Sequence, residues 1–328
     1  MELIAFSYLL LFFIIAFGIL AIGRMVEKML MQMRHGWVRL LIIVPQGLVN
    51  PLANHRPHEI FQSAELYKRL GELNIPFTLE TAVHSVGEEI HFYLYVPTFF
   101  SKNVCKLVES LWPSGYITRA DDYELWLGNS PENSGHIAAG YLAQVKPYCI
   151  PFKSAQRGHF EPFLGILRHL SGLAAVGEGA AIQWIVRKAD PRLIEDIGDH
   201  LRKFQEGEYH PSRHVHENFL LTRDTIKLLE EKVSSPLFAV NCRIITTGSG
   251  GNAKQLLEHL ASHFSAGSAT GREHNQFKLE EPKQPERLID AFLSRRFEPS
   301  QEMIITANEL ATYFHFPGPT TAAPKIKR

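Results

Sequence analysis

The glycine-rich loop at residues 246–255 lies where a stretch typical of a β-strand passes into a stretch typical of a helix. Such a loop can hold phosphate on the backbone N–H groups that begin the helix. A P-loop also needs Gly-Lys-Ser/Thr, so that an ammonium group and a Mg²⁺-binding hydroxyl meet at the phosphates. Here Ala253 precedes Lys254 and Gln255 follows it. We therefore expect a tight strand-to-helix turn that does not hydrolyse nucleotides.

A group of histidines, His210, His214 and His216, could in principle hold a metal ion. Residues two apart on a helix do not share a face, so His214 and His216 would be poor joint ligands there. An extended segment would allow them to chelate together with Glu217. We interpret the group as the solvated tip of an insertion, and the chelating alternative stays open.

An acidic cluster of Asp121, Asp122 and Glu124 is the remaining candidate for chemistry. Adjacent carboxylates do not make a general acid–base pair unless a pocket brings them to a substrate. The chain contains neither GxSxG nor HExxH. We therefore expect no catalytic, cofactor-binding or metal-ligating residues, no cofactor, and no enzymatic activity.

The composition limits the possible partners and the compartment. Lys+Arg and Asp+Glu both number 34, so the formal net charge is zero. A protein that coats DNA normally carries a basic excess, and this class is disfavoured. The cysteines, Cys105, Cys149 and Cys242, are far apart and without CxxC, which is typical of buried thiols in a reducing compartment. The tryptophans Trp112, Trp126 and Trp184 are expected to anchor the core or a domain interface.

The start of the chain, residues 3–22, is an uncharged apolar run. At about 1.5 Å of rise per residue, a helix of this length would cross a bilayer core of about 30 Å. A basic segment with Arg24, Lys28 and Arg34 follows, and basic residues favour the cytoplasmic side. We therefore expect a transmembrane anchor and juxtamembrane helix at residues 1–35, in a single-pass protein of the inner (cytoplasmic) membrane with a cytoplasmic body.

The first predicted domain covers residues 36–127. Its elements alternate as β-α-β-β-α-β and are expected at residues 37–45, 58–70, 76–83, 90–96, 101–111 and 116–120. The two middle strands are joined by a short connection with Gly87, which is typical of a hairpin. This order is the split βαβ pattern of a ferredoxin-like sandwich.

The same order returns after a polar linker at residues 128–136, in a second domain at residues 137–316. Strands are expected within 137–150 and at 180–186, 237–246 and 276–279, with helices at 160–173, 253–264, 286–297 and 308–313. A charged helical insertion occupies about residues 190–236, with helices at 191–204 and 215–233. Residues 317–328 are rich in proline and basic residues and are predicted to be a linker-like tail.

The sequence thus predicts an α+β fold. It consists of an N-terminal transmembrane helix followed by two tandem ferredoxin-like (split βαβ) sandwiches, the second of which carries the helical insertion.

Several stretches also resemble a known bacterial family. They are HEIFQSAELYKRL, IPFTLETAVHSVGEEIHFYLYVP, YITRADDYELW and the closing ITANELATYFHFPGPTTAAPKIKR. Together they are similar to the membrane-anchored region of conjugative coupling-protein-like ATPases of the type IV secretion and HerA/FtsK superfamily. In that family a transmembrane start and a two-part α/β region precede a P-loop motor. An ELA-x-x-(Y/F)-H-(F/L)-P stretch lies just before the motor. The resemblance covers nearly all of the chain.

This resemblance implies a non-catalytic, membrane-anchored module of a type IV secretion or conjugative DNA-transfer system, which positions a DNA-translocating ATPase at the membrane. No Walker A or Walker B motif lies in these residues, so the ATPase activity of the family is not carried over. The motor would then be on a separate polypeptide or in a longer product.

The implied partners are the lipid bilayer, the P-loop ATPase or other secretion-system subunits, and further copies of this chain. The copies would form a homo-oligomer, for which a hexamer is one candidate. Direct contact with DNA is left open. Two alternatives remain. One is a stand-alone membrane-tethered enzyme and the other a nucleic-acid-binding module, each using the surface between the two α/β domains.

Overall fold

The structure of the chain is a computed structural model. It describes residues 36–45, 58–84, 89–121, 136–155, 161–173, 178–206, 223–248, 251–265, 274–318, 321 and 323–327. No helix within these ranges is both long and apolar enough to cross a membrane. This finding corrects the predicted transmembrane helix and the predicted membrane localisation. The apolar run at residues 3–22, on which that prediction rested, lies outside the described residues.

The first half of the fold is an antiparallel sheet in the order β4-β1-β3-β2, with helices α2 and α3. Its elements are β1 (Trp37–Ile43), α2 (His58–Glu72), β2 (Phe77–Val83), β3 (His91–Pro97), the 3₁₀ turn η1 (Thr98–Phe100), α3 (Ser101–Leu111) and β4 (Tyr116–Arg119). Strand β3 lies between β1 and β2, the two strands that α2 connects. This arrangement is what a split βαβ unit requires.

The second half repeats this order as β6-β7-β5-β8. Its elements are β5 (His136–Gln144), α4 (Pro162–Ser171), β6 (Gly179–Lys188), α5 (Arg192–Gln205), α6 (Arg223–Val233), β7 (Leu237–Gly248), α7 (Asn252–Ser265) and β8 (Phe277–Glu280). Here β7 lies between β5 and β6, as β3 does between β1 and β2. The β-α-β-β-α-β order predicted for this half is therefore observed.

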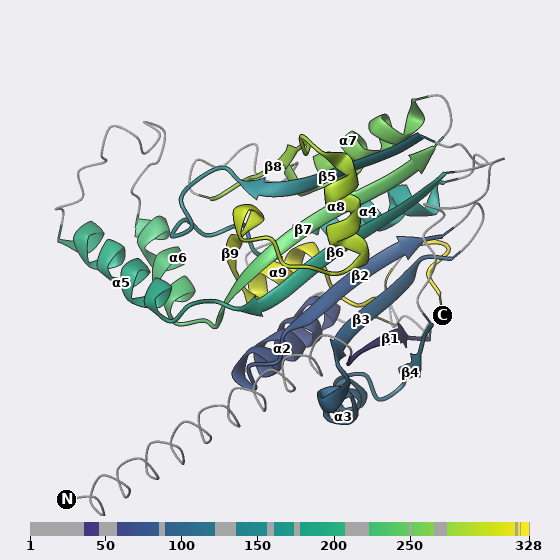
Figure 1. Cartoon of the computed structure of the whole chain (residues 1–328). Coiled ribbons are helices and arrows are strands. Elements are labelled where there is room, and N and C mark those ends of the chain that lie inside the picture. The colour runs from purple at the N-terminus through teal and green to yellow at the C-terminus, as the bar shows by residue number, and fades with distance from the viewer. Residues whose placement is uncertain are drawn as a thin grey trace, which may run out of the picture.

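The two halves do not form separate sandwiches, which corrects the predicted architecture. Strand β2 pairs antiparallel with β6 over its whole length, from Phe77 opposite Val186 to Val83 opposite Ala180. One sheet of nine antiparallel strands results, and it runs without a break across both halves (Figure 1). An unpaired edge strand exposes a row of backbone N–H and C=O groups. Each half uses the edge strand of the other to satisfy these groups.

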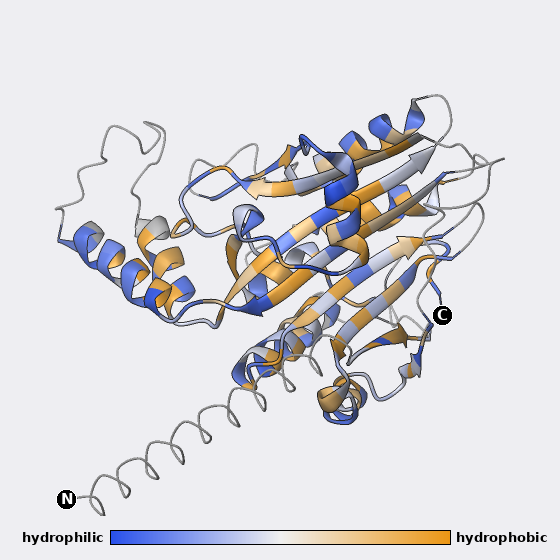
Figure 2. Ribbon diagram, viewed as in Figure 1, coloured by the Kyte–Doolittle hydropathy of each residue, from blue (hydrophilic) through white to orange (hydrophobic). Residues whose placement is uncertain are grey.

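The sheet has two faces of different character, and strand β3 shows how the sequence creates them. Successive side chains of a strand point to opposite faces. Phe92 and Leu94 belong to the main core, which lies between the sheet and the helices. Tyr93 and Tyr95 point the other way and pack with a second cluster, to which Leu288 contributes. Apolar residues dominate the strands, whereas hydrophilic residues gather on the helices α5 and α7 (Figure 2).

Helix α2 shows why its sequence forms an amphipathic helix on this sheet. Ile60, Ala64 and Tyr67 recur at helical spacing and are buried, whereas Lys68 and Arg69 are exposed. An apolar stripe of this kind faces the core in a surface helix. Burial of the stripe supplies most of the stability of such a short helix.

The helices α5 and α6 form the predicted insertion between β6 and β7 and lie beyond one end of the sheet (Figure 1). The described part of helix α6 runs from Arg223 to Val233, and the start predicted at residue 215 lies outside the described residues. The fully buried Lys232 attaches α6 to the rest of the fold. Its ammonium donates to the carbonyl of Ile304 at 3.0 Å and lies 3.7 Å from a carboxylate oxygen of Glu309.

The last part of the chain adds α8 (Pro285–Leu293), the 3₁₀ turn η3 (Pro299–Gln301), β9 (Met303–Thr306) and α9 (Ala307–Tyr313). Helix α8 crosses the sheet face that the other helices leave open (Figure 1). Strand β9 pairs with β7 and was not predicted from the sequence. Helix α9 confirms the predicted helix at residues 308–313. It begins with a capping box, in which Thr306 accepts from the Glu309 N–H and Glu309 accepts from the Thr306 N–H.

The described part of the tail differs from a solvated linker. Ile326 is buried and forms a β-bridge with Ile90. The Ile90 N–H donates to the carbonyl of Lys325 at 2.6 Å, and the Lys327 N–H donates to the carbonyl of Ile90 at 3.0 Å. The proline-rich composition of this segment does not reveal a bridge to a residue so distant in the sequence.

We predict that the aromatic side chains at the C-terminal end of α9 stabilise the whole fold. Tyr313 is fully buried, with its ring centroid 4.7 Å from that of Phe277. Tyr313→Ala or Phe314→Ala should lower the free energy of unfolding by about 3–5 kcal/mol, because each leaves a large cavity. Urea unfolding of the full chain measures this. Phe99→Ala is the control, since Phe99 is 88% exposed and its loss should cost within about 0.5 kcal/mol. A loss below about 1 kcal/mol for Tyr313→Ala would contradict the prediction.

Candidate functional site

The glycine-rich loop forms the expected strand-to-helix turn between β7 and α7 in its described part. Gly251 has φ +92°, a left-handed conformation that favours glycine. Lys254 does not lie in a phosphate-binding arrangement. Its ammonium is 2.8 Å from a carboxylate oxygen of Glu281, and both side chains are largely exposed.

The described part of the chain contains only some of the other residues singled out from the sequence. His210, His214, His216, Glu217, Asp122, Glu124 and Trp126 lie outside the described residues. Asp121 is exposed, and its backbone carbonyl accepts from Arg39 at 2.5 Å. Trp112 and Trp184 are buried in the core, as predicted. The three cysteines are free thiols, and Cys149 and Cys242 are buried.

A row of polar side chains crosses the α8 face of the sheet, and sequence analysis missed it. The strand register aligns Tyr93 on β3, Glu80 on β2, Gln183 on β6, Arg243 on β7 and Tyr141 on β5. We call these residues the polar row. A signal does exist in the sequence, because Glu80 and Arg243 are the only charged residues of β2 and β7, and Gln183 interrupts an apolar run of β6. Only the pairing of strands distant in the chain shows that they are neighbours.

Arg243 is the centre of the polar row and is fully buried. Its Nη1 donates to the Ala291 carbonyl at 2.7 Å and to Gln183 Oε1 at 3.4 Å. Its Nη2 donates to the Arg296 carbonyl at 2.6 Å and to Asn241 Oδ1 at 3.4 Å. Nε donates to Gln301 Oε1 at 3.2 Å. All the N–H donors of a guanidinium are thereby used, and Arg243 ties α8 and the loop after it to β7.

The guanidinium of Arg243 stays charged despite its burial. Burial lowers its pKa to about 10, and the nearby carboxylate of Glu298 partly offsets this effect. The group is therefore protonated at neutral pH. The carbonyls that it contacts belong to the C-terminal end of α8 and the loop that follows, where a cation is favoured by the helix dipole. The charge is thus solvated by the protein rather than by water.

The part of the polar row that belongs to the first half of the fold contains a buried carboxylate. Glu80 accepts from Gln183 Nε2 at 2.8 Å and from Arg295 Nε at 2.9 Å. Arg295 follows α8 and has φ +50°, a position usually taken by glycine at a helix C-terminus. The contact of the Arg295 side chain explains why arginine occupies this position, because the side chain reaches across the boundary between the two halves to Glu80. Its guanidinium also lies over the Tyr95 ring, 3.7 Å from the centroid.

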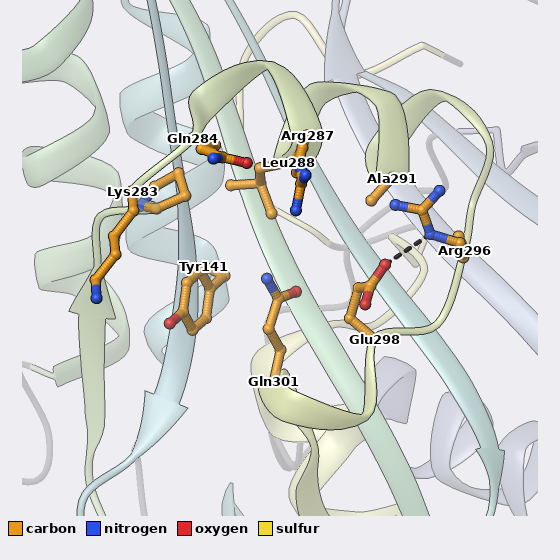
Figure 3. A pocket seen from close by; sticks show the side chains of 10 residues that line it. Tyr141, Lys283, Gln284, Arg287, Leu288, Ala291, Arg296, Glu298 and Gln301 are labelled. Carbon is orange, nitrogen blue, oxygen red and sulfur yellow. Dashed lines mark hydrogen bonds and ion pairs between the residues drawn. The ribbon is translucent and has the colours of Figure 1, made fainter.

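A cleft of about 470 Å³ opens between α8 and the second half of the polar row, and we call it the α8 cleft. Tyr141 of β5 forms one side, and Arg287 of α8 and Gln301 of η3 point toward the same space (Figure 3). Glu298 and Arg296 close the far end, where they form an ion pair of 2.6 Å. Lys283 lies at the opposite end from this ion pair, and its side chain extends away from Arg287 (Figure 3). The lining therefore combines an aromatic ring, amides and a surplus of positive charge.

The chemistry of this lining suits binding. An activated nucleophile needs a base within hydrogen-bond reach. The residues that line the cleft include no Ser, Thr, Cys or His. Guanidinium and ammonium groups with amide donors instead suit the recognition of an anion. We therefore take the α8 cleft, held in shape by Arg243, as the candidate functional site.

A cluster of three histidines lies on the opposite side of the sheet, where α4 and α7 meet. His169 has its ring centroid 5.7 Å from that of His259 and 5.8 Å from that of His263. Within the described residues no group of His, Cys, Asp and Glu side chains is arranged to hold a metal ion. This cluster was not predicted from the sequence, because α4 and α7 are separated by two strands and the helical insertion.

Neither the family models nor the curated proteins with which the chain was compared give a match. The function is therefore inferred from the resemblance of the sequence stretches and from the geometry of the described residues.

We predict that Arg295 holds the two halves together at a cost in backbone strain. Arg295→Ala should lower the free energy of unfolding by about 3–5 kcal/mol, because it removes an ion-pair partner of the buried Glu80. Arg295→Gly should cost about 1 kcal/mol less than Arg295→Ala, because glycine adopts φ +50° without strain. Urea unfolding of both variants measures the difference. Equal losses would contradict the role of backbone strain, and losses below about 1 kcal/mol would contradict the ion pair.

We also predict that the histidine cluster makes stability depend on pH. Burial and the neighbouring His259 lower the pKa of His169 below 6.5, although Glu178 opposes this effect. Burial and neighbouring histidines likewise lower the pKa of His263. The unfolded chain then binds more protons than the folded one, so stability rises as the pH increases toward 6.5 and the penalty is complete below the lowered pKa values. Unfolding midpoints measured from pH 5 to 7.5 should rise less steeply in His169→Gln. Parallel curves would contradict the prediction.

Proposed function

We propose that the described part of this chain is a non-catalytic module that positions a DNA-translocating P-loop ATPase in a type IV secretion or conjugative DNA-transfer system. The ATPase would be of the coupling-protein class to which the sequence shows its resemblance. Positioning requires a rigid body with fixed relations between its surfaces. A single sheet locked on both faces meets this requirement, because its two halves cannot move independently without breaking strand pairs.

The observation that carries the proposal is the place of the closing resemblance stretch, which begins at residue 305 and is described without a gap to residue 318. It crosses the boundary between the two halves and is bonded to both. Tyr67 Oη of α2 donates to the Phe314 carbonyl at 3.1 Å, and the Phe316 N–H donates to Ser63 Oγ at 3.0 Å. On the other side, the Ala155 N–H donates to Thr312 Oγ1 at 3.0 Å. One of the stretches that carry the resemblance is thus bonded to both halves of the module.

The environment of Lys254 supports the non-catalytic part of the proposal. Its ammonium is held by Glu281 on the surface, whereas a P-loop lysine must reach the terminal phosphates of a bound nucleotide. The hydrogen bond and the charge of Glu281 raise the pKa of Lys254. The ammonium charge is therefore already matched by a carboxylate.

The alternatives expected from the sequence placed an activity on the surface between the two α/β domains. That surface is internal to the sheet, where β2 pairs with β6 and Glu80 contacts Gln183. The geometry therefore favours neither an enzyme nor a nucleic-acid interface at this place. The positioning role includes self-association, with a hexamer as the form that matches a ring-shaped motor.

The proposal predicts association with a motor and no turnover by the chain alone. The chain is co-expressed with a P-loop ATPase of the coupling-protein class, and co-elution and DNA-stimulated ATP hydrolysis are measured. We expect a complex whose hydrolysis rate differs from that of the free motor, and no hydrolysis by the chain alone. Lys254→Ala should change neither result. The absence of a complex would contradict the proposal, as would turnover by the chain alone that disappears in Lys254→Ala.

A further inference from the structure

We infer that the α8 cleft binds a phosphorylated ligand of nucleotide size, with its phosphate at Arg287 and an aromatic base against Tyr141. This inference goes beyond the positioning role and does not depend on it. The volume of about 470 Å³ falls within the range of small-molecule sites, which is about 300–1,000 Å³.

The charge of the cleft is the first step of the inference. Three basic side chains line it, Lys283, Arg287 and Arg296, against the single carboxylate of Glu298. Glu298 already pairs with Arg296 at 2.6 Å. Within the described part of the chain, Arg287 and Lys283 have no hydrogen-bond or ion-pair partner for their charged groups. Both side chains are exposed and free to meet a ligand.

The shape of a guanidinium decides which anion suits this charge. Its planar fork of N–H donors matches two oxygens of a phosphate, and Arg287 points into the cleft (Figure 3). Helix α8 also begins at this end of the cleft, with Pro285 at its first turn and no side-chain cap on its N-terminus. The positive end of its dipole adds to the attraction for an anion.

A positioned amide supplies the next contact. Gln301 Oε1 accepts from the buried Arg243 at 3.2 Å, which fixes the orientation of the amide. Its Nε2 donors are thereby presented to the cleft, where Gln301 points toward the space beside Tyr141 (Figure 3). Arg243, whose guanidinium donates to five acceptors, thus orients the Gln301 amide so that its N–H donors face the ligand.

Tyr141 gives the cleft an aromatic side, and its ring is half-buried beside Gln301 and Leu288. Aromatic rings stack on any nucleobase, and such stacking contributes substantially to nucleotide affinity. The balanced charge of the whole chain argues against a long nucleic-acid tract, which would need a wider basic surface. A single nucleotide satisfies the charge, the amide and the ring together.

The test is titration calorimetry of the full chain with AMP, with inorganic phosphate, and with a single-stranded oligonucleotide. We expect AMP to bind. Arg287→Ala should weaken AMP binding at least about tenfold, because it removes a charge-assisted hydrogen bond. Tyr141→Ala should weaken AMP binding without changing the binding of phosphate. Arg119→Ala is the matched control, since Arg119 is an exposed arginine on β4, in the other half of the sheet.

Circular dichroism and unfolding midpoints confirm that each variant is folded. No binding of AMP would overturn the inference, and so would equal losses in Arg287→Ala and Arg119→Ala. Phosphate binding as tight as AMP binding would overturn the role of Tyr141. An oligonucleotide that binds far more tightly than AMP would show a nucleic-acid surface instead of a nucleotide site. Binding that disappears in Lys254→Ala would place the site at the glycine-rich loop and not in the α8 cleft.

Discussion

The buried guanidinium of Arg243 is the interaction on which the rest of the structure depends. Removing a charge from water is costly, and the cost is tolerated only when the surroundings supply matching hydrogen bonds. Here the acceptors come from β6, β7, the end of α8, the loop after it and η3. Each of these elements is therefore constrained by the same side chain. The helix could not cross the sheet at another place without leaving a buried cation short of acceptors.

The boundary between the halves is held on both faces of the sheet by different physics. On the α8 face, Glu80 is shared between Gln183 of the second half and Arg295 after α8. On the helix face, the segment after α9 packs aromatic rings into the main core, with the Phe314 centroid 5.1 Å from that of Phe163. Directional ionic hydrogen bonds define the register, and apolar burial supplies most of the free energy. The pairing of β2 with β6 also removes two exposed sheet edges that would invite aggregation.

These constraints also shape the α8 cleft. Tyr141 is the neighbour of Arg243 in the strand register, and Gln301 accepts a hydrogen bond directly from Arg243. The groups that face the cleft are thus set by the network behind it, which is how rigid binding sites are generally supported. A module that positions another protein benefits from the same rigidity, so the two inferred roles place the same demand on the fold.

Local patterns in the sequence were enough for most of the elements. Alternating residues predicted β2 and β3, helical spacing predicted α2 and α4, and the residues around α9 predicted a helix that does begin with a capping box. Such features depend on neighbours a few residues apart, which the sequence displays directly. The pairing of β2 with β6, the strand β9 and the tail bridge between Ile326 and Ile90 were not predictable in this way. They join residues far apart in the chain, and one apolar strand resembles another. The polar row and the α8 cleft arise from those pairings, so only the tertiary structure could bring Glu80, Gln183 and Arg243 into one network.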